Sequence, residues 1–227
     1  MVKEGYYFGL PLLLLAGGAY LLEWPALAVV LVLLALFVFS FFRDPERAIP
    51  QESGAIVSPA DGRIVVVTDE EYAGRPGKRI SIFLAVWNVH VNRSPAAGVL
   101  TNLEYRPGKF LAAMRAEASL QNEQNIFSLS TDTGDMAFKQ IAGLIARRVV
   151  SWKKAGDRVA RGERIGLVRF GSRADVWLPR EAEIRVQVGD RVKGGSSVLA
   201  TWLPKNAGST EQDRQSEAKL AGAAKPA

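Results

Sequence analysis

The chain has 227 residues, no cysteine, one histidine and a formal net charge of +6. This composition excludes disulfides, thiolate metal sites, cysteine nucleophiles and a metal centre built on several histidines, so we expect no metal. The positive charge fits an anionic partner, either a nucleic acid or an acidic membrane surface, and the apolar N-terminus favours the membrane over nucleic acid.

Two apolar stretches open the chain, from Tyr6 to Leu22 and from Ala26 to Phe42, with a short Glu-Trp-Pro break between them. At about 1.5 Å per helical residue, each is near the lower limit for crossing a hydrocarbon layer of ~30 Å. Two short spans and a re-entrant hairpin therefore both remain open. We expect residues 1–42 to form a membrane anchor of two short hydrophobic helices. The positive charges at the outer ends, Lys3 and Arg43, predict that the remainder lies at the cytoplasmic face of the cell membrane.

The rest of the chain divides by composition. Residues 43–53 are rich in proline and charge and form a predicted linker, residues 54–204 form one domain, and residues 205–227 form a predicted disordered tail. The domain is predicted to be mainly β with few short helices, because its apolar runs are rich in valine and isoleucine and are bounded by glycine, proline and aspartate. Strands are expected at Ala55–Val57, Gly62–Thr68, Arg79–Leu84, Gly98–Tyr105, Asn125–Ser130 and Asp135–Ile141, and a helix at Lys109–Ala118.

A weak repeat occurs late in the chain, where the segment from Gly156 to Gly162 recurs from Gly189 to Gly195. Each copy has a glycine-aspartate turn, a valine and a second glycine before another apolar strand. Similar turns occur in the flattened barrels of lipoyl and biotinyl carriers, so we predict a barrel-sandwich, lipoyl-like domain. A membrane-anchored adaptor or carrier without catalysis is therefore one interpretation. A carrier would need a lysine at the tip of its hairpin, and the sequence places none there.

Polar residues that could carry chemistry occur in two places before the repeat. Asp61 lies in a Pro-Ala-Asp-Gly turn, where an aspartate often bonds its own backbone. His90 is the single imidazole, and strand alternation places Asn88, His90 and Asn92 on one face, opposite Trp87, Val89 and Val91. That polar face is either solvated surface or a site. The polar run at 121–125 is more typical of a loop.

The Gly171-Ser172 bond follows an expected strand and precedes another apolar stretch. An ordinary loop is the simplest interpretation, because turns are rich in both residue types. A strained Gly-Ser bond can also react with itself: the hydroxyl of Ser172 attacks the carbonyl of Gly171 and turns the amide into an ester that later breaks. The other Gly-Ser bonds, at 195–196 and 208–209, lie in the repeat and in the expected tail.

Several motifs occur in one order: Pro-Ala-Asp-Gly at 59–62, Val-His-Val-Asn-Arg at 89–93, Asn-Glu-x-Asn at 122–125, Gln-Ile-Ala-Gly-Leu-Ile-Ala-Arg-Arg at 140–148 and Phe-Gly-Ser-Arg at 170–173. With the N-terminal anchor they resemble the short, archaeal-type class of phosphatidylserine decarboxylase proenzymes, from about residue 43 to residue 204.

The resemblance implies that the chain cuts itself at Gly171-Ser172, giving a β chain, 1–171, and an α chain, 172–227. The ester formed by Ser172 would undergo β-elimination, and hydrolysis would leave a pyruvoyl group with loss of ammonia. This cofactor, derived from Ser172, would form a Schiff base with the headgroup amine of an aminophospholipid in the membrane. It would then accept the electrons left by departing carbon dioxide, so that phosphatidylserine becomes phosphatidylethanolamine.

The longer class of the family uses an Asp-His-Ser constellation like a protease triad. By motif, Asp61 and Ser172 supply the two ends, but the later of the two histidines of that class falls at Arg93. Either His90 serves both maturation and proton transfer, or another group takes one task. Substrate binding is expected from Asn88, Asn92, Arg147 and Arg148, since guanidinium pairs well with lipid phosphate.

Three points stay open at this stage. The lipid could carry acyl or ether chains, which would make archaetidylserine the substrate, and the chain could form a homo-oligomer. A membrane-bound peptidase would use the same aspartate, histidine and serine, but the sequence lacks the Gly-x-Ser-x-Gly elbow of many such hydrolases.

Overall fold

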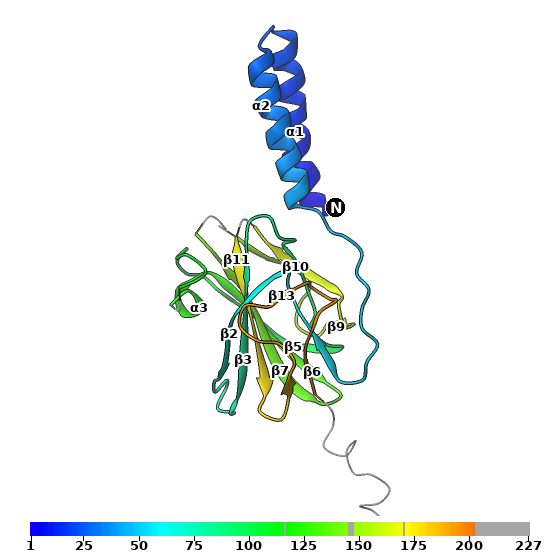
Figure 1. The fold of residues 1–227 in the computed structure, drawn as a ribbon, viewed down its shortest axis with the longest axis vertical. Helices are drawn as coiled ribbons and strands as arrows, with labels where there is room; N and C mark the ends of the chain where they lie inside the picture. Colours follow the sequence, from blue (N-terminus) through cyan, green and yellow to red (C-terminus); the bar gives the residue numbers. More distant parts are fainter. Residues whose placement is uncertain (116, 145–147, 170, 203–227) are drawn as a thin grey trace, which may run out of the picture.

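The structure is a computed structural model that describes residues 1–115, 117–144, 148–169 and 171–202. Two antiparallel helices, α1 (Lys3–Leu21) and α2 (Pro25–Phe41), stand out from one end of a β-rich domain (Figure 1). Proline at the first position of α2 suits a helix start, because that position needs no N–H donor. The tail expected at 205–227 lies outside the described residues.

Small residues line the contact between the two helices. A side chain on Gly9 would collide with the ring of Phe39, and the buried positions include Ala16, Ala19 and Ala35. Leucines and valines face outward along most of the hairpin, as Leu21 with 82% exposure illustrates. Measured by length and hydropathy, no helix in the described part of the chain qualifies to cross a membrane.

The base of the hairpin packs on the β domain. Phe41 and Phe42 form one buried apolar cluster with Val89, Val91 and Leu167 of the domain. Val89 and Val91 flank His90, and Leu167 lies in the strand that leads toward residue 172. The hairpin and the candidate site therefore occupy the same end of the molecule.

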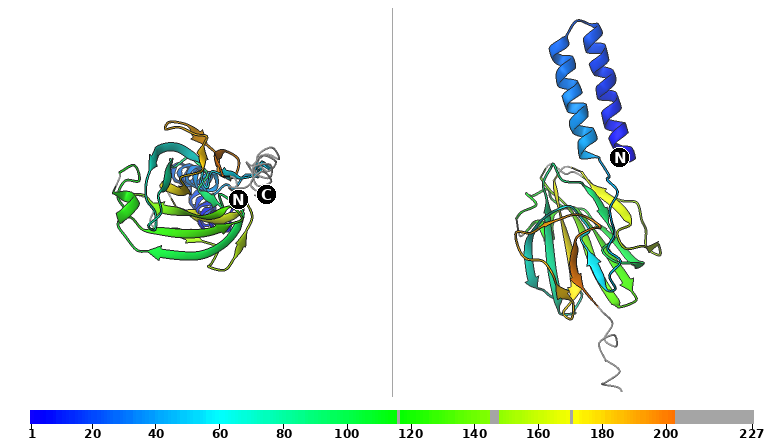
Figure 2. Two further views of the ribbon diagram at one scale, coloured as in Figure 1. Left: turned by 90° about the horizontal axis from the view of Figure 1, so that it is seen from below. Right: turned by 45° about the vertical axis from the view of Figure 1, so that its right-hand side comes forward.

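All strands of the β domain pair antiparallel. The main sheet has eight strands and curves around the core (Figure 2). Its order is β13 (Arg191–Val192), β2 (Gly62–Asp69), β3 (Gly77–Leu84), β11 (Ser172–Pro179), β7 (Gly134–Ala142), β6 (Gln124–Thr131), β5 (Gly98–Arg106) and β9 (Arg158–Val159). Two three-stranded sheets have the orders β1 (Ala55–Val57), β14 (Val198–Thr201), β12 (Glu183–Ile184) and β4 (Val91–Arg93), β10 (Arg164–Val168), β8 (Val149–Ser151).

The core lies on the concave side of the main sheet and explains its alternating pattern. Ile80, Ile82 and Val176 are completely buried there, and the rings of Phe127 and Phe138 stack with centroids 4.7 Å apart. Every strand expected from the sequence is present, with ends within a few residues of the predicted ones. The prediction of a mainly β domain is thereby confirmed.

The sequence repeat is also a repeat in structure. Gly156 and Gly189 both have left-handed backbone angles, with φ of 92° and 101°. The two-residue strands that follow them, β9 and β13, close opposite edges of the main sheet. In each copy the aspartate side chain accepts a hydrogen bond from a backbone N–H three residues earlier. Two turns of the same design therefore terminate the two sheet edges.

The helix expected at Lys109–Ala118 is wrong in position. The structure has instead a single turn, α3 (Ala118–Gln121). Lys109 forms an isolated bridge to Asn122, and the side chain of Asn122 both accepts from the N–H of Leu111 and donates to its carbonyl. These tertiary hydrogen bonds occupy the backbone groups that a helix would need.

The predicted linker at 43–53 contains no helix or strand, and side chains tie it to the β domain. Arg161 donates to the carbonyls of Pro50 and Glu52, and Asp44 forms ion pairs with Arg93 and Arg164. These contacts fix the route by which the hairpin reaches the domain. The domain boundaries themselves stay predictions.

Candidate active site

The single histidine contacts the Gly-Ser bond. The backbone nitrogen of Gly171 donates to Nε2 of His90 at 3.1 Å. The contact arises because β4 runs beside β10, the strand that leads into Gly171, and the N–H of Val168 donates to the carbonyl of His90. Two segments about 80 residues apart in the sequence thus meet at the predicted cleavage site.

The hydrogen bonds of His90 define its protonation. Its Nδ1 lies 2.9 Å from the carbonyl oxygen of Asn88, which can only accept, so Nδ1 carries the proton and Nε2 is an acceptor. Burial lowers the pKa of His90 to about 4, the bond to Asn88 opposes this shift, and the charge of Arg43 adds to it. The ring lies against Phe41, with centroids 4.2 Å apart. The imidazole is therefore a neutral base at pH 7, with its acceptor nitrogen toward Gly171.

Ser172 is the first residue of β11 and is completely buried. Its neighbours across the sheet are Leu84 and Ala142. The Oγ atom is buried and has no hydrogen-bond partner among the described residues, although a buried hydroxyl normally finds one. A hydroxyl without a partner is available to react. Among the described residues, no group of three or more acidic, histidine or cysteine side chains is placed to hold a metal ion.

Two glycines shape the carbonyl that Ser172 would attack. Gly171 has a φ of 78°, a left-handed conformation that side-chain-bearing residues rarely adopt. A Cβ atom on Gly143 would lie 2.5 Å from the carbonyl oxygen of Gly171, so only glycine leaves room there. The sequence showed Gly143 within a motif but gave no sign of this contact.

Asp61 is not joined to His90. Both of its carboxylate oxygens lie 2.9 Å from Nη2 of Arg47, and one also accepts from the N–H of Gly194 at 2.8 Å. Since both nitrogens of His90 face backbone atoms, Asp61, His90 and Ser172 do not form the hydrogen-bonded triad that the resemblance implied.

The position of Arg93 explains this departure. The backbone N–H of Arg93 donates to the carbonyl of Pro59, which is in the same turn as Asp61. Position 93, and not position 90, therefore lies beside that turn. The side chain of Arg93 instead reaches Asp44 at 2.9 Å. With arginine at this position, Asp61 pairs with a linker cation, Arg47, and has no imidazole beside it.

The two predicted asparagines have different surroundings. The side chain of Asn88 accepts from the N–H of Ala85 and closes a turn, while its carbonyl orients His90. Asn92 is buried and accepts from Gln140 at 3.0 Å. The alternation predicted for residues 87–92 is wrong, because the strand begins only at Val91. Trp87 is 76% exposed, whereas Val89 and His90 are both buried.

A buried charged network lies on the other face of β11. Arg173 donates to Asp175 at 2.6 Å and to Ser81 at 2.8 Å, and the hydroxyl of Ser119 donates to Asp175 at 2.6 Å. Arg79 also approaches Asp175 at 3.6 Å. These contacts join β3, β11 and α3 directly behind Ser172. The sequence analysis missed this network, since its members are far apart along the chain.

The structure describes one of the two arginines that are predicted to bind phosphate. Arg147 lies outside the described residues, and Arg148 is exposed. Arg169, which the sequence analysis did not single out, lies with its guanidinium carbon 5.4 Å from the ring centroid of Phe8 in the hairpin. Its Nε atom is buried and has no hydrogen-bond partner among the described residues. The guanidinium group of Arg169 thus lies against the hairpin, two residues before Gly171 in the chain.

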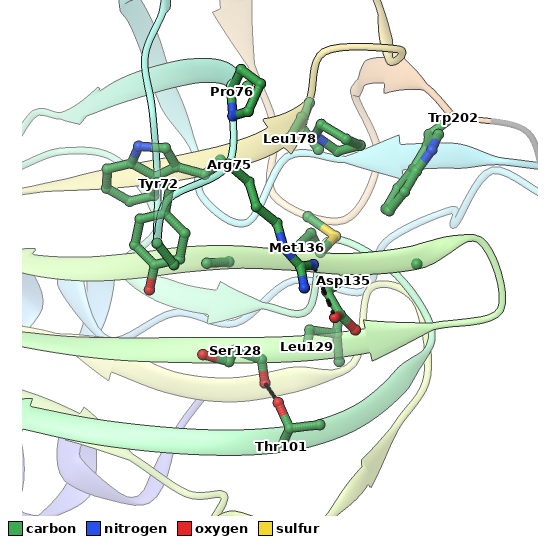
Figure 3. Close-up of a pocket in the computed structure, with 16 residues that line it drawn as sticks. Tyr72, Arg75, Pro76, Thr101, Ser128, Leu129, Asp135, Met136, Leu178 and Trp202 are labelled. Atoms are coloured by element: carbon green, nitrogen blue, oxygen red, sulfur yellow. Dashed lines mark hydrogen bonds and ion pairs between the residues drawn. The ribbon is translucent and has the colours of Figure 1, made fainter.

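A pocket of about 440 Å³ lies at the opposite end of the strands. Figure 3 shows Tyr72, Met136 and Trp202 around it, with Arg75 directed toward Asp135. It is lined by the last residues of β11 and the first residues of β7, whereas Ser172 begins β11. At about 3.3 Å per residue this is roughly 17 Å from the candidate site, so the pocket plays no part in it.

Comparison with known proteins finds matches over most of the chain. A family model described as phosphatidylserine decarboxylase matches residues 34–200. The chain is 49% identical over 203 residues to the phosphatidylserine decarboxylase proenzyme of Symbiobacterium thermophilum, covering 88% of this chain and 94% of that one. It is 50% identical over 203 residues to the proenzyme of Solibacter usitatus, covering 89% and 97%.

Proposed function

The chain belongs to the phosphatidylserine decarboxylase family, and we propose that it converts phosphatidylserine into phosphatidylethanolamine and carbon dioxide after cutting itself between Gly171 and Ser172. The observation that carries the proposal is the contact of the neutral His90 with Gly171, next to a buried Ser172 hydroxyl that has no hydrogen-bond partner in the described part of the chain. The adaptor and peptidase interpretations have no comparable support.

Self-cleavage uses groups beside the bond, once Nε2 of His90 exchanges its hydrogen bond from the N–H of Gly171 for one from the hydroxyl of Ser172. The oxygen of Ser172 attacks the carbonyl carbon of Gly171, a C–O bond forms, and the amide C–N bond breaks. His90 takes the hydroxyl proton, because its low pKa leaves it neutral at pH 7, and returns a proton to the departing nitrogen. The left-handed Gly171 and the bare Cα of Gly143 leave the carbonyl open to attack. The structure depicts the chain before this reaction, with Ser172 still joined to Gly171.

Elimination and hydrolysis at residue 172 then give the pyruvoyl group, with a β chain of 1–171 and an α chain of 172–227. The residues fit this group: residue 172 is completely buried, and its neighbour across the sheet is the small side chain of Ala142. When present, the pyruvoyl ketone supplies the electron sink that amino-acid decarboxylation requires. The side chains of the site therefore do not have to accept these electrons themselves.

One histidine is sufficient for maturation and turnover because the two tasks follow each other in time. The position of His90 is set by Asn88 and Phe41, and neither contact depends on the bond that breaks. In this proposal His90 keeps these contacts after cleavage and delivers a proton to the carbon that loses carbon dioxide. Asp61 supports the site indirectly, by holding the linker through Arg47.

The sheet keeps the new N-terminus of the α chain in place. β11 pairs with β3 from Ser172 to Pro179 and with β7 from Ser172 to Trp177. Arg173, Asp175 and Ser119 add buried hydrogen bonds directly next to the cut. Cleavage therefore removes one covalent bond from a strand that is held on both sides.

The hairpin supports action at the cytoplasmic face of the cell membrane. Its outward leucines and valines form an apolar surface, and its base packs against the strands that carry the site. Contiguous apolar surface of this kind is typical of membrane contact. In this proposal the hairpin is the anchor, and Arg169 between hairpin and site pairs with the lipid phosphate.

Intact-protein mass spectrometry tests the proposal. The purified chain is expected to give two fragments that separate after Gly171, the smaller one with a blocked N-terminus lighter than serine. Ser172→Ala should remain one chain without decarboxylase activity. Ser196→Ala is the matched control, because it changes the other described Gly-Ser bond, and should split normally. An uncut wild-type chain that decarboxylates the lipid would overturn the proposal.

A further inference from the structure

Glu123 lies in line with Ser172 across the main sheet, in one row of residues that are paired from strand to strand. Gln124 pairs with Ile141 across β6 and β7, and the N–H of Ala142 donates to the carbonyl of Glu123 at 2.9 Å, so Glu123 stands opposite Ala142. Ala142 in turn pairs with Ser172. Neighbouring strands are about 4.8 Å apart, which places the Cα atoms of Glu123 and Ser172 about 10 Å apart with one alanine between them.

The side chain of Glu123 points to the same face as Ser172. Its Oε1 atom accepts from the N–H of Val149 at 3.1 Å, and Val149 forms a buried cluster with Ala142 and Val168. Residues paired across strands share a face, so Ala142 and Ser172 face that cluster together. The carboxylate therefore lies on the face of the sheet that also carries Ser172, with Ala142 between the two residues.

Among the described strand residues on this face, none in the two rows nearest Glu123 carries a positive charge. The described rows on this face contain Glu123, Ala142, Ser172 and Leu84, then Tyr105, Asn125, Gln140, Ala174, Ile82 and Ile64. Neither row includes lysine or arginine. Glu123 is 7% exposed, and a buried carboxylate is stable only with a charged or hydrogen-bonding partner. The Val149 N–H supplies one such bond, and a cationic ligand would supply charge.

We propose that Glu123 binds the ammonium of the aminophospholipid headgroup and holds it beside residue 172. This inference rests on the proposed function and names the residue that recognises the amine. The carboxylate pairs with the ammonium on arrival, at a distance from Ser172 that the width of one strand sets. A headgroup of the same size without an amine gains nothing from this contact, so Glu123 contributes to specificity as well as affinity.

Glu123→Gln separates this role from a purely structural one. The amide oxygen of glutamine can still accept the hydrogen bond from Val149, so the fold and self-cleavage should be retained while the charge is lost. Glu104→Gln is the matched control, because Glu104 lies on β5 and pairs with Arg106 at the surface. Both variants lose one negative charge, but only the first loses it on the face of Ser172.

The measurement is the dissociation constant of two soluble headgroups with the matured enzyme, by calorimetry. Glu123→Gln should weaken binding of glycerophosphoethanolamine by about 10- to 100-fold, the range for a lost hydrogen bond to a charged group. It should leave glycerophosphoglycerol within about twofold, since that compound has the phosphate without the amine. Mass spectrometry on the same samples reports the extent of cleavage. Equal effects on both ligands, or none, would overturn the role of Glu123.

A second variant covers the case in which glutamine prevents maturation. Glu123→Asp keeps the charge but shortens the side chain by one methylene. It should therefore weaken the binding of glycerophosphoethanolamine selectively, and by less than Glu123→Gln does. An unselective loss would contradict the proposal. A wild-type chain that is not cut at Gly171 would instead refute the proposed function, whereas a cut, active enzyme whose ammonium binding ignores Glu123 would refute this inference alone.

Discussion

The Nε2 atom of His90 accepts a hydrogen bond from the backbone nitrogen of Gly171 at 3.1 Å, so the single imidazole of the chain touches the residue whose carbonyl is to be attacked. This contact requires a neutral ring, because a protonated Nε2 could not accept. Burial against the apolar base of the hairpin keeps the ring neutral. The hairpin thus contributes to the protonation state of His90 through the ring of Phe41.

The low pKa of His90 predicts acid sensitivity of the fold. At pH values between the ordinary pKa of 6.5 and the folded pKa of about 4, His90 binds a proton in the unfolded chain but not in the folded chain. The free energy of unfolding should therefore fall as pH drops through this window, by about 3 kcal/mol at most, and His90 should contribute no slope above it. Chemical denaturation of the uncut Ser172→Ala chain in detergent at several pH values measures this.

The comparison for that experiment is His90→Asn in the same uncut background. It should be less stable at pH 7, because the N–H of Gly171 loses its acceptor, and its stability should fall less between pH 6.5 and 4. An unchanged slope in the variant would assign the acid sensitivity to other groups.

Gly143→Ala should slow self-cleavage. The added methyl would lie 2.5 Å from the carbonyl oxygen of Gly171 and must displace it, and a shift of about 1 Å in a reacting group can cost roughly 100-fold in rate. The time course of splitting during cell-free synthesis, followed by mass spectrometry, measures the effect. Gly17→Ala is the control, since nothing lies within 4 Å of the position a Cβ would take there. Cleavage of Gly143→Ala at the wild-type rate would show that the carbonyl needs no such space.

Asp175→Asn should strongly destabilise the domain. The change leaves Arg173, which is 3% exposed, without its anionic partner, and breaking a buried ion pair on one side costs about 3–5 kcal/mol. Chemical denaturation of the uncut Ser172→Ala chain gives the free energy of unfolding. Asp135→Asn, in an exposed ion pair with Arg75, should change it by less than about 1 kcal/mol. Similar values for the two variants would mean that the network does not hold β11.

Arg169→Lys should raise the KM for phosphatidylserine vesicles by roughly tenfold while leaving self-cleavage intact. Lysine keeps the charge but loses the planar pair of donors that binds phosphate. Steady-state kinetics with the lipid in vesicles measures the change, and Arg158→Lys at an exposed sheet edge serves as the control. Equal KM values for the two variants would remove Arg169 from phosphate binding.

The sequence by itself determined the class of fold and predicted the bond that we propose is cut. Strand alternation and turn residues predicted the β domain, and the Gly-Asp repeat predicted two matching turns, because these signals depend on neighbours along the chain. The order of motifs indicated the family, and with it Ser172. The prediction of a helix at Lys109–Ala118 was wrong because local signals do not include tertiary contacts. The backbone of that segment is held by the side chain of Asn122, some ten residues further along the chain.

Only the tertiary structure decided which groups surround Ser172. It placed His90 at Gly171 and joined Asp61 to Arg47, although motif order had suggested a triad. It also aligned Glu123 with Ser172 across two strand spacings, where the sequence showed only a polar run. Sheet register and side-chain contacts between distant segments are set by packing of the whole core, so no local pattern reveals them.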